Sequence, residues 1–214
     1  MSDDSSTHRP SADELEPRLP RLLEIHELRA EARRRQRKWW VLLYVALATL
    51  VVDQASKQWA HTTLRSDHGG RLKVVKSLFS LTYVRNPGAA WGFLARRPAS
   101  FRKPFFLAVS VIAIAFILYL YVRLTIGQRL LMYALALVMG GALGNFVDRL
   151  RFNFVIDFLD VYFGRLFKWP TFNIADVAIS VGVVMLFYEM ISSMIAEWRS
   201  RRRARAAATA APEE

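Results

Sequence analysis

The chain of 214 residues contains no cysteine, which excludes disulfide bonds, thiol catalysis and cysteine-ligated metal sites. Its histidines lack the spacing of metal ligands, so we interpret them as solvated surface residues; they are His8, His26, His61 and His68. No internal repeat is evident, and low complexity is confined to an arginine- and alanine-rich C-terminal tail. The sequence therefore predicts neither a metal site nor a cofactor.

Charge is missing from two long stretches, Pro104–Val122 with 19 residues and Leu130–Val147 with 18. A membrane-spanning helix needs roughly 20 mostly apolar residues, so both stretches are candidate spans. Two further apolar segments contain a few polar residues, one from Trp39 to about His61 and one from about Asn173 to Ala196. The sequence therefore predicts an α-helical membrane protein with four transmembrane helices.

The segments between the spans indicate what lies at the membrane surface. Leu72–Asn86 is rich in β-branched and aromatic residues, which favours a small extracytoplasmic β-sheet. The return segment Phe152–Trp169 alternates apolar and charged residues, and we expect it to lie along the outer surface as a helix or loop. Residues 39–197 would thus form one membrane domain, flanked by charged tails at 1–38 and 198–214.

The net charge of +12 would suit a nucleic-acid-binding protein, because basic patches bind phosphate. However, nine of the 30 basic residues lie in residues 1–38 and five lie between Arg199 and Arg205, so they flank the apolar region. Basic flanks favour the cytoplasmic side, and four spans place both termini on one side. We therefore expect both termini in the cytoplasm, membrane lipid as a partner and no nucleic acid.

The N-terminal tail has two interpretations. Apolar residues between Leu19 and Leu28 have the spacing of a short amphipathic helix that could lie on anionic lipid. The alternative is a disordered tail whose basic end anchors the topology. We favour the disordered tail.

Carboxylates are concentrated between the third and fourth spans. Asp148, Asp157 and Asp176 fall within one short return, together with Asn145, Arg149 and Asn173. Ionisable groups at the edge of a bilayer are costly and are therefore functional candidates. Two carboxylates that share a site do not both ionise easily, and such a pair can activate water and protonate a scissile amide. A structural or ion-coupling role is the alternative.

Other polar residues at this membrane edge also allow two readings. Asp53 and Lys57 lie four residues apart on the first span, so they can form an ion pair that is structural or belongs to the site. Asn86–Gly88 predicts a turn that is structural or binds substrate. Arg149 either contacts substrate carbonyls or neutralises its aspartate neighbour. Ser56 and Lys57 do not form a nucleophilic pair, because adjacent helical residues do not face each other.

Five motifs resemble those of lipoprotein signal peptidase, also called signal peptidase II. In order, they are Asp53-Gln-Ala-Ser-Lys57, Asn86-Pro-Gly-Ala-Ala-Trp-Gly92, Gly144-Asn-Phe-Val-Asp-Arg149, Val155-Ile-Asp157-Phe and Phe172-Asn-Ile-Ala-Asp176. The resemblance covers the chain from about residue 40 to residue 197. It implies a bacterial inner-membrane aspartic endopeptidase that cleaves signal peptides from diacylglyceryl-modified prolipoproteins, amino-terminal to the lipidated cysteine.

By motif position, the resemblance implies that Asp157 and Asp176 form the catalytic pair. The other motif residues of the family correspond to Asp53, Lys57, Asn86, Gly88, Asn145, Asp148, Arg149, Asn173 and Ala175. The long charged N-terminus and the arginine-rich C-terminal tail are departures that the family pattern does not require.

Two other protein classes account for parts of the pattern. A proton-coupled small membrane transporter would use the aspartate cluster, but its carboxylates should lie at the membrane midplane or on broken helices. A non-catalytic membrane scaffold would explain the spans and leave the clustered aspartates and asparagines unexplained. The sequence therefore favours the peptidase, which we expect to act as a monomer on lipid-modified prolipoproteins.

Overall fold

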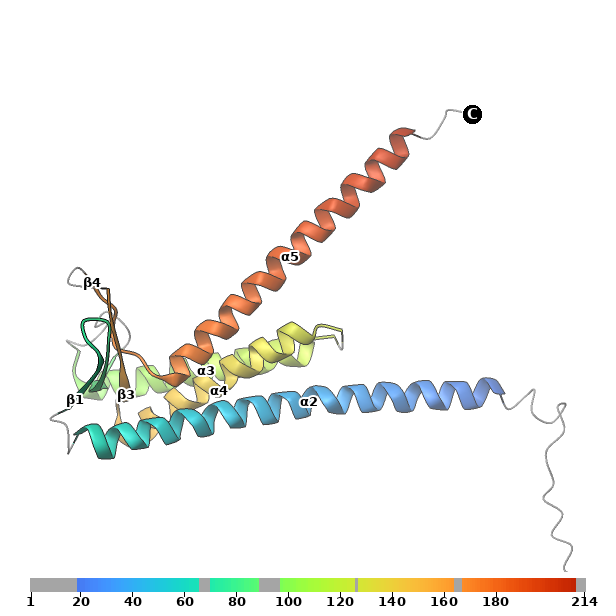
Figure 1. Ribbon diagram of the computed structural model, residues 1–214. Coiled ribbons are helices and arrows are strands. Elements are labelled where there is room, and N and C mark those ends of the chain that lie inside the picture. The colour runs from blue at the N-terminus through green and yellow to red at the C-terminus, as the bar shows by residue number, and fades with distance from the viewer. Residues whose placement is uncertain (1–18, 66–69, 89–96, 126, 164–166, 211–214) are drawn as a thin grey trace, which may run out of the picture. The chain divides into compact units, whose positions relative to one another are not determined.

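The computed structural model describes residues 19–65, 70–88, 97–125, 127–163 and 167–210 (Figure 1). The chain divides into two units, Met1–Trp40 and Val41–Glu214. The helices are α2 (Leu19–Trp59), the π-helical turn η1 (Ala60–Leu64), α3 (Ala99–Arg123), α4 (Arg129–Phe152) and α5 (Ile174–Ala210). The strands are β1 (Arg71–Val75), β2 (Phe79–Asn86), β3 (Val155–Phe163) and β4 (Phe167–Lys168).

Among the residues that the structure describes, four helical segments are long and apolar enough to cross a membrane, in agreement with the four predicted spans. They are Glu27–Leu64, Ala99–Arg123, Arg129–Phe152 and Ile174–Arg205. A helix suits a bilayer because it satisfies every backbone polar group within the segment. In α4, 56% of the most apolar window is buried in the protein, against 22% in α3, so α4 is the central helix.

Small residues allow α4 to approach its neighbours closely. A Cβ atom on Gly140 would lie 2.7 Å from the carbonyl oxygen of Ala46 in α2, and one on Gly141 would lie 2.5 Å from that of Ala175 in α5. These distances leave no room for a side chain, as in other close helix contacts in membranes. Farther along the bundle, the apolar core consists of Ala46, Ile117, Tyr121, Met132, Leu135 and Met139.

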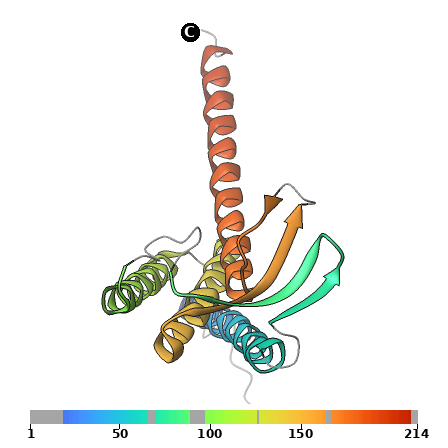
Figure 2. The ribbon, with the colours of Figure 1, turned by 90° about the vertical axis from the view of Figure 1, so that its left-hand side faces the viewer.

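The four strands form one antiparallel sheet in the order β1-β2-β3-β4 (Figure 2). In the β2–β3 pair, Val84 lies opposite Asp157 and Asn86 lies opposite Val155. Phe158 packs against Ala60 and Leu64 of η1, so the sheet rests on the end of the first span. The fold thus places β3 between the end of α4 and the start of α5.

The sequence identified only half of this sheet. The predicted strands in Leu72–Asn86 are confirmed as β1 and β2. The return segment Phe152–Trp169, expected as a surface helix or loop, instead forms β3 and β4. Val155–Phe163 is rich in β-branched and aromatic residues, as strands are, and β2 supplies its backbone partners.

The N-terminal tail also differs from the favoured interpretation, because the chain is helical from Leu19 rather than disordered. Residues 1–18 lie outside the described part of the chain. The same holds for residues 89–92 of the predicted turn motif, whereas Asn86–Gly88 is described.

Gly144 should accept no larger residue. A Cβ atom there would lie 2.4 Å from Oδ2 of Asp53, whereas a Cβ atom on Gly127 would meet no atom within 4 Å. We expect Gly144→Ala to destabilise the protein by roughly 1–3 kcal/mol, because overpacking forces buried groups apart. Gly127→Ala is the matched control and should change stability by less than about 0.5 kcal/mol. Thermal unfolding in one detergent compares them, and equal melting temperatures would contradict the close packing of α2 on α4.

Candidate active site

A buried ion cluster joins α2 to α4. Lys57 Nζ lies 2.9 Å from Oδ2 of Asp53 and 3.1 Å from Oδ2 of Asp148, and no side chain of the three is more than 1% exposed. Each carboxylate also accepts a backbone N–H: Ala175 donates to Asp53 at 2.8 Å, and Ile156 donates to Asp148 at 3.0 Å. Buried charges persist only when they are paired and hydrogen-bonded. The cluster therefore ties the first turn of α5 and the start of β3 to the helices.

Lys57 also sets the orientation of Asn145. The ammonium group donates to Oδ1 of Asn145 at 2.9 Å. Because an ammonium group has no acceptor, the amide oxygen must face it, and the amide nitrogen must face the other way. That nitrogen donates to Oδ1 of Asp176 at 2.9 Å. The buried cluster thus directs one hydrogen bond onto Asp176.

A capping box at the start of α5 holds Asp176 from the other side. The Asp176 N–H donates to Oδ1 of Asn173 at 3.0 Å, and the Asn173 N–H donates to Oδ2 of Asp176 at 3.2 Å. This reciprocal pattern is common at helix N-termini, with Glu or Gln in the position of this aspartate. Because Oδ1 of Asn173 accepts the capping bond, its Nδ2 is free to donate to Oδ1 of Asp157 at 2.7 Å.

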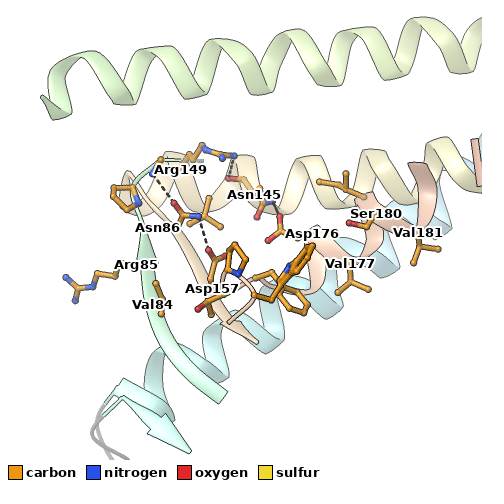
Figure 3. Close-up of a pocket in the computed structure, with 18 residues that line it drawn as sticks. Val84, Arg85, Asn86, Asn145, Arg149, Asp157, Asp176, Val177, Ser180 and Val181 are labelled. Atoms are coloured by element: carbon orange, nitrogen blue, oxygen red, sulfur yellow. Dashed lines mark hydrogen bonds between the residues drawn. The ribbon is translucent and has the colours of Figure 1, made fainter. Parts of the chain in front are cut away.

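Asn86 reaches Asp157 from the sheet. Its Oδ1 accepts the Gly88 N–H at 3.1 Å, and its Nδ2 donates to Oδ2 of Asp157 at 2.9 Å (Figure 3). The turn after β2 therefore orients this amide just as the capping box orients Asn173. Each oxygen of Asp157 therefore accepts one amide N–H. Asn173 also donates to Oδ1 of Asn145 at 3.2 Å, and Asn145 donates to Asp176, so the two carboxylates belong to one network.

Asp157 is suited to proton transfer near neutral pH. Burial, followed by the charge of Asp176, raises the pKa of Asp157 to about 7, although hydrogen bonds from Asn86 and Asn173 act in the opposite direction. The side chain is 2% exposed. A group that exchanges its proton near the working pH is an effective general acid or base. Asp176 lies in the first turn of α5, where the helix dipole favours a negative charge.

A pocket of about 790 Å³ opens beside both carboxylates (Figure 3). Its apolar lining includes Val84, Val155, Phe172, Val177, Ile179 and Val181. Arg149 also lines the pocket, and it donates to the carbonyl oxygen of Asn145 at 3.4 Å and lies over the ring of Phe106 at 5.4 Å. Asp148 has Lys57 as its ion-pair partner, so the structure favours a pocket role for Arg149 over neutralisation of Asp148.

The structure brings all of the predicted site residues into this one network, and it adds others. Gln54 Nε2 lies 3.2 Å from Oδ2 of Asp53 and 3.1 Å from both Oδ1 of Asp148 and the carbonyl oxygen of Gly144. Its position beside Asp53 within an apolar span was the signal that could have identified it. Ser110 of α3, a helix in which we predicted no site residue, accepts from Arg149 at 3.5 Å.

Comparisons with known proteins agree with this geometry. The family model for signal peptidase (SPase) II matches residues 45–192, a range that contains the whole site. The chain belongs to the signal peptidase II family. Lipoprotein signal peptidase of Syntrophus aciditrophicus (strain SB) is 46% identical over 157 residues, which are 71% of this chain and 92% of that protein. Lipoprotein signal peptidase of Geobacter sulfurreducens is 48% identical over 147 residues, 69% of this chain and 89% of that protein.

Two solved structures, each of a bacterial membrane enzyme, have the same fold. One has a TM-score of 0.62 and 28% identity and covers 72% of this chain and 88% of its own. The other has a TM-score of 0.59 and 31% identity and covers 70% of this chain and 91% of its own. Membership of the family makes the chain an aspartic-type peptidase in a multi-pass membrane fold, and the transporter alternative is not supported.

Removal of Lys57 should be far more costly than removal of an exposed cation. We expect Lys57→Met to destabilise the protein by roughly 3–5 kcal/mol, because it leaves two buried carboxylates without a counter-charge. The control is Arg201→Met, which breaks an ion pair with Glu197 whose side chains are 72% and 61% exposed. That change should cost no more than about 1 kcal/mol. Chemical unfolding of both variants measures the difference, and similar values would show that the cluster does not support the fold.

Proposed function

We propose that Asp157 and Asp176 catalyse the cleavage of prolipoprotein signal peptides by this chain, at the bond amino-terminal to a diacylglyceryl-modified cysteine. The observation that carries the proposal is the meeting of two carboxylates, one from β3 and one from α5, at the wall of a single large pocket. The relatives named lipoprotein signal peptidase support the substrate class.

In the first step, Asp176 acts as the base and Asp157 as the acid. The Asp176 carboxylate takes a proton from a water molecule, whose oxygen attacks the carbonyl carbon of the scissile amide. Asp157 gives its proton to the carbonyl oxygen, which becomes a hydroxyl group on a tetrahedral carbon. This assignment follows from the raised pKa of Asp157 and from the helix N-terminus beneath Asp176.

In the second step, the tetrahedral carbon loses the amine. The proton on Asp176 passes to the amide nitrogen, the C–N bond breaks, and Asp157 retakes the hydroxyl proton as the carbonyl re-forms. The products are a signal peptide with a new carboxyl terminus and a lipoprotein with a new amino terminus. No covalent enzyme intermediate is needed, in keeping with a chain that has no cysteine.

The pocket offers partners for both parts of the substrate. The guanidinium of Arg149 can donate to backbone carbonyls of the peptide, which would position the scissile bond beside the two carboxylates. The valine, isoleucine and phenylalanine side chains of the lining suit the apolar residues of a signal peptide and an acyl chain. Asn86, Asn145 and Asn173 hold the acid and the base in place.

We also propose a location for the chain in the bacterial inner membrane, as a monomer with both termini cytoplasmic and the sheet outside. The basic residues at both ends of the spans support this orientation. Residues 39–197 would then be the catalytic domain, with the tails 1–38 and 198–214 outside it. A reporter that is active only in the cytoplasm should be active when fused after Glu214, and a reporter that is active only in the periplasm should be inactive there. Activity of the periplasmic reporter would contradict the proposed orientation.

The catalytic pair has a kinetic signature. Asp157→Asn and Asp176→Asn should each lower kcat/KM for a lipidated prolipoprotein by roughly a thousandfold or more, and the double variant should lose little beyond this, since the two act as a unit. In the wild type, kcat/KM should fall as pH rises through about 7, because Asp157 then loses the proton that it must donate. Gel-shift analysis of cleavage in detergent micelles measures both effects.

Asp160→Asn is the matched control, because Asp160 is a second buried carboxylate on β3. It accepts a hydrogen bond from Thr82 at 3.1 Å and lies 3.2 Å from Lys168 Nζ, and it does not line the pocket. We expect this variant to lose stability but to keep the pH profile of the wild type. Near-normal cleavage by either Asp157→Asn or Asp176→Asn would refute the assignment.

A further inference from the structure

A cluster of rings lies beside the ends of α2 and α4, outside the catalytic pocket. His61 of η1 stacks on Phe152 with ring centroids 5.6 Å apart, and Phe152 stacks on Phe154 at 5.7 Å. Nδ1 of His61 is within hydrogen-bond distance, 2.9 Å, of the Tyr83 hydroxyl on β2. We refer to these four residues as the aromatic cluster. It joins the first span, the end of α4 and the sheet.

Three exposed arginines surround the aromatic cluster. The Arg85 guanidinium lies 5.9 Å from the ring of Tyr83 and 5.3 Å from that of Phe154, and the Arg151 guanidinium lies 4.8 Å from the ring of Phe152. Arg65 follows η1 directly and has helical backbone angles, so it lies four residues after His61 on one face of the same helical segment. We refer to Arg65, Arg85 and Arg151 as the arginine patch. In Figure 3, Arg85 extends from β2 away from Asp157.

The arginine patch carries positive charge that the described residues do not neutralise. The ion pairs found in the described ranges use Lys57, Lys168 and Arg201, and none of them uses an arginine of the patch. A guanidinium held against a ring keeps its planar set of donors in a fixed direction, which suits the oxygens of a phosphate.

The patch also lies at the ends of two candidate membrane spans. Arg65 is one residue beyond the candidate span Glu27–Leu64, and Arg151 is one residue before the end of the span Arg129–Phe152. Aromatic residues are enriched at membrane–water interfaces because one part of the ring is apolar and another polar. Arginines near a bilayer surface attract anionic lipid headgroups.

From these observations, we propose that the arginine patch and the aromatic cluster bind the phosphate of an anionic phospholipid headgroup, with the rings against its glycerol and upper acyl region. Arg85 directly precedes Asn86, the amide that donates to Asp157. A lipid bound at this place would therefore hold β2 against the membrane beside the catalytic pocket. Arg85 also lines the catalytic pocket, but the chemical steps proposed above use no residue of the arginine patch, so the proposal goes beyond that function.

Native mass spectrometry of the purified full chain in detergent tests the site, with phosphatidylglycerol and phosphatidylcholine as the probes. The wild type should retain phosphatidylglycerol in preference to phosphatidylcholine. The double variant Arg65→Gln/Arg151→Gln should weaken phosphatidylglycerol binding by roughly 30-fold, since each arginine near a headgroup contributes a factor of about five. The matched control is Arg123→Gln, an arginine that lies 5.4 Å from the ring of Tyr119 at the opposite end of the bundle. It should keep the preference.

Two further arms complete the test. Arg65→Lys/Arg151→Lys should restore most of the binding, because the charge returns, and this distinguishes a lost site from a misfolded protein. Inorganic phosphate in equal concentration should not displace the lipid; displacement would indicate a site for free phosphate and overturn the lipid assignment. Equal retention of both lipids by the wild type, or an unchanged preference in the double glutamine variant, would overturn the proposal as well.

Discussion

The active site depends on one buried ammonium group that can donate hydrogen bonds but cannot accept them. Lys57 neutralises Asp53 and Asp148, and it forces the oxygen of Asn145 to face inward. The same principle recurs at two other amides, where a backbone N–H takes the place of the ammonium group. Asn173 is oriented by the capping box of α5, and Asn86 by the turn after β2. In each case the amide nitrogen faces one of the two carboxylates that we propose to be catalytic, so rotation of any one amide would remove a hydrogen bond from Asp157 or Asp176.

The packing of the spans makes this arrangement possible. Gly144 lets α4 pass so close to α2 that Asp53 reaches the backbone of Ala175 on α5, a hydrogen bond between residues 122 positions apart. A polar network of this density would be very costly at the centre of a bilayer, where charges have no water and few partners. Here it lies where α4 ends and α5 begins, next to the sheet. In the orientation proposed above this is the edge of the membrane, where water and a membrane-embedded substrate can meet, as the proposed hydrolysis of a lipidated peptide requires.

The sequence predicted the spans well, because charge-free runs such as Pro104–Val122 are long and apolar enough to cross a membrane. The motif residues, proposed as the site, lie together in one network. The sequence identified β1 and β2 but not β3, since the apolar and charged residues of the return segment follow no two-residue period and β3 forms by pairing with β2. The Asn173–Asp176 capping box was readable from its spacing. The orientation of the amides could not be predicted from the sequence, because it depends on contacts between distant residues, such as the hydrogen bond from Lys57 to Asn145, 88 positions later in the chain.

The protonation of Asp157 can be observed directly by infrared spectroscopy, through the carboxyl stretch of a protonated aspartate followed from acid to alkaline pH. The wild type should show such a band disappearing as pH rises through about 7, and Asp157→Asn should lack it. In Asp176→Asn the transition should move to lower pH, because the charge of Asp176 helps to raise the pKa of Asp157. A band that persists unchanged in Asp157→Asn would show that the shared proton lies elsewhere and would contradict the proposed pair.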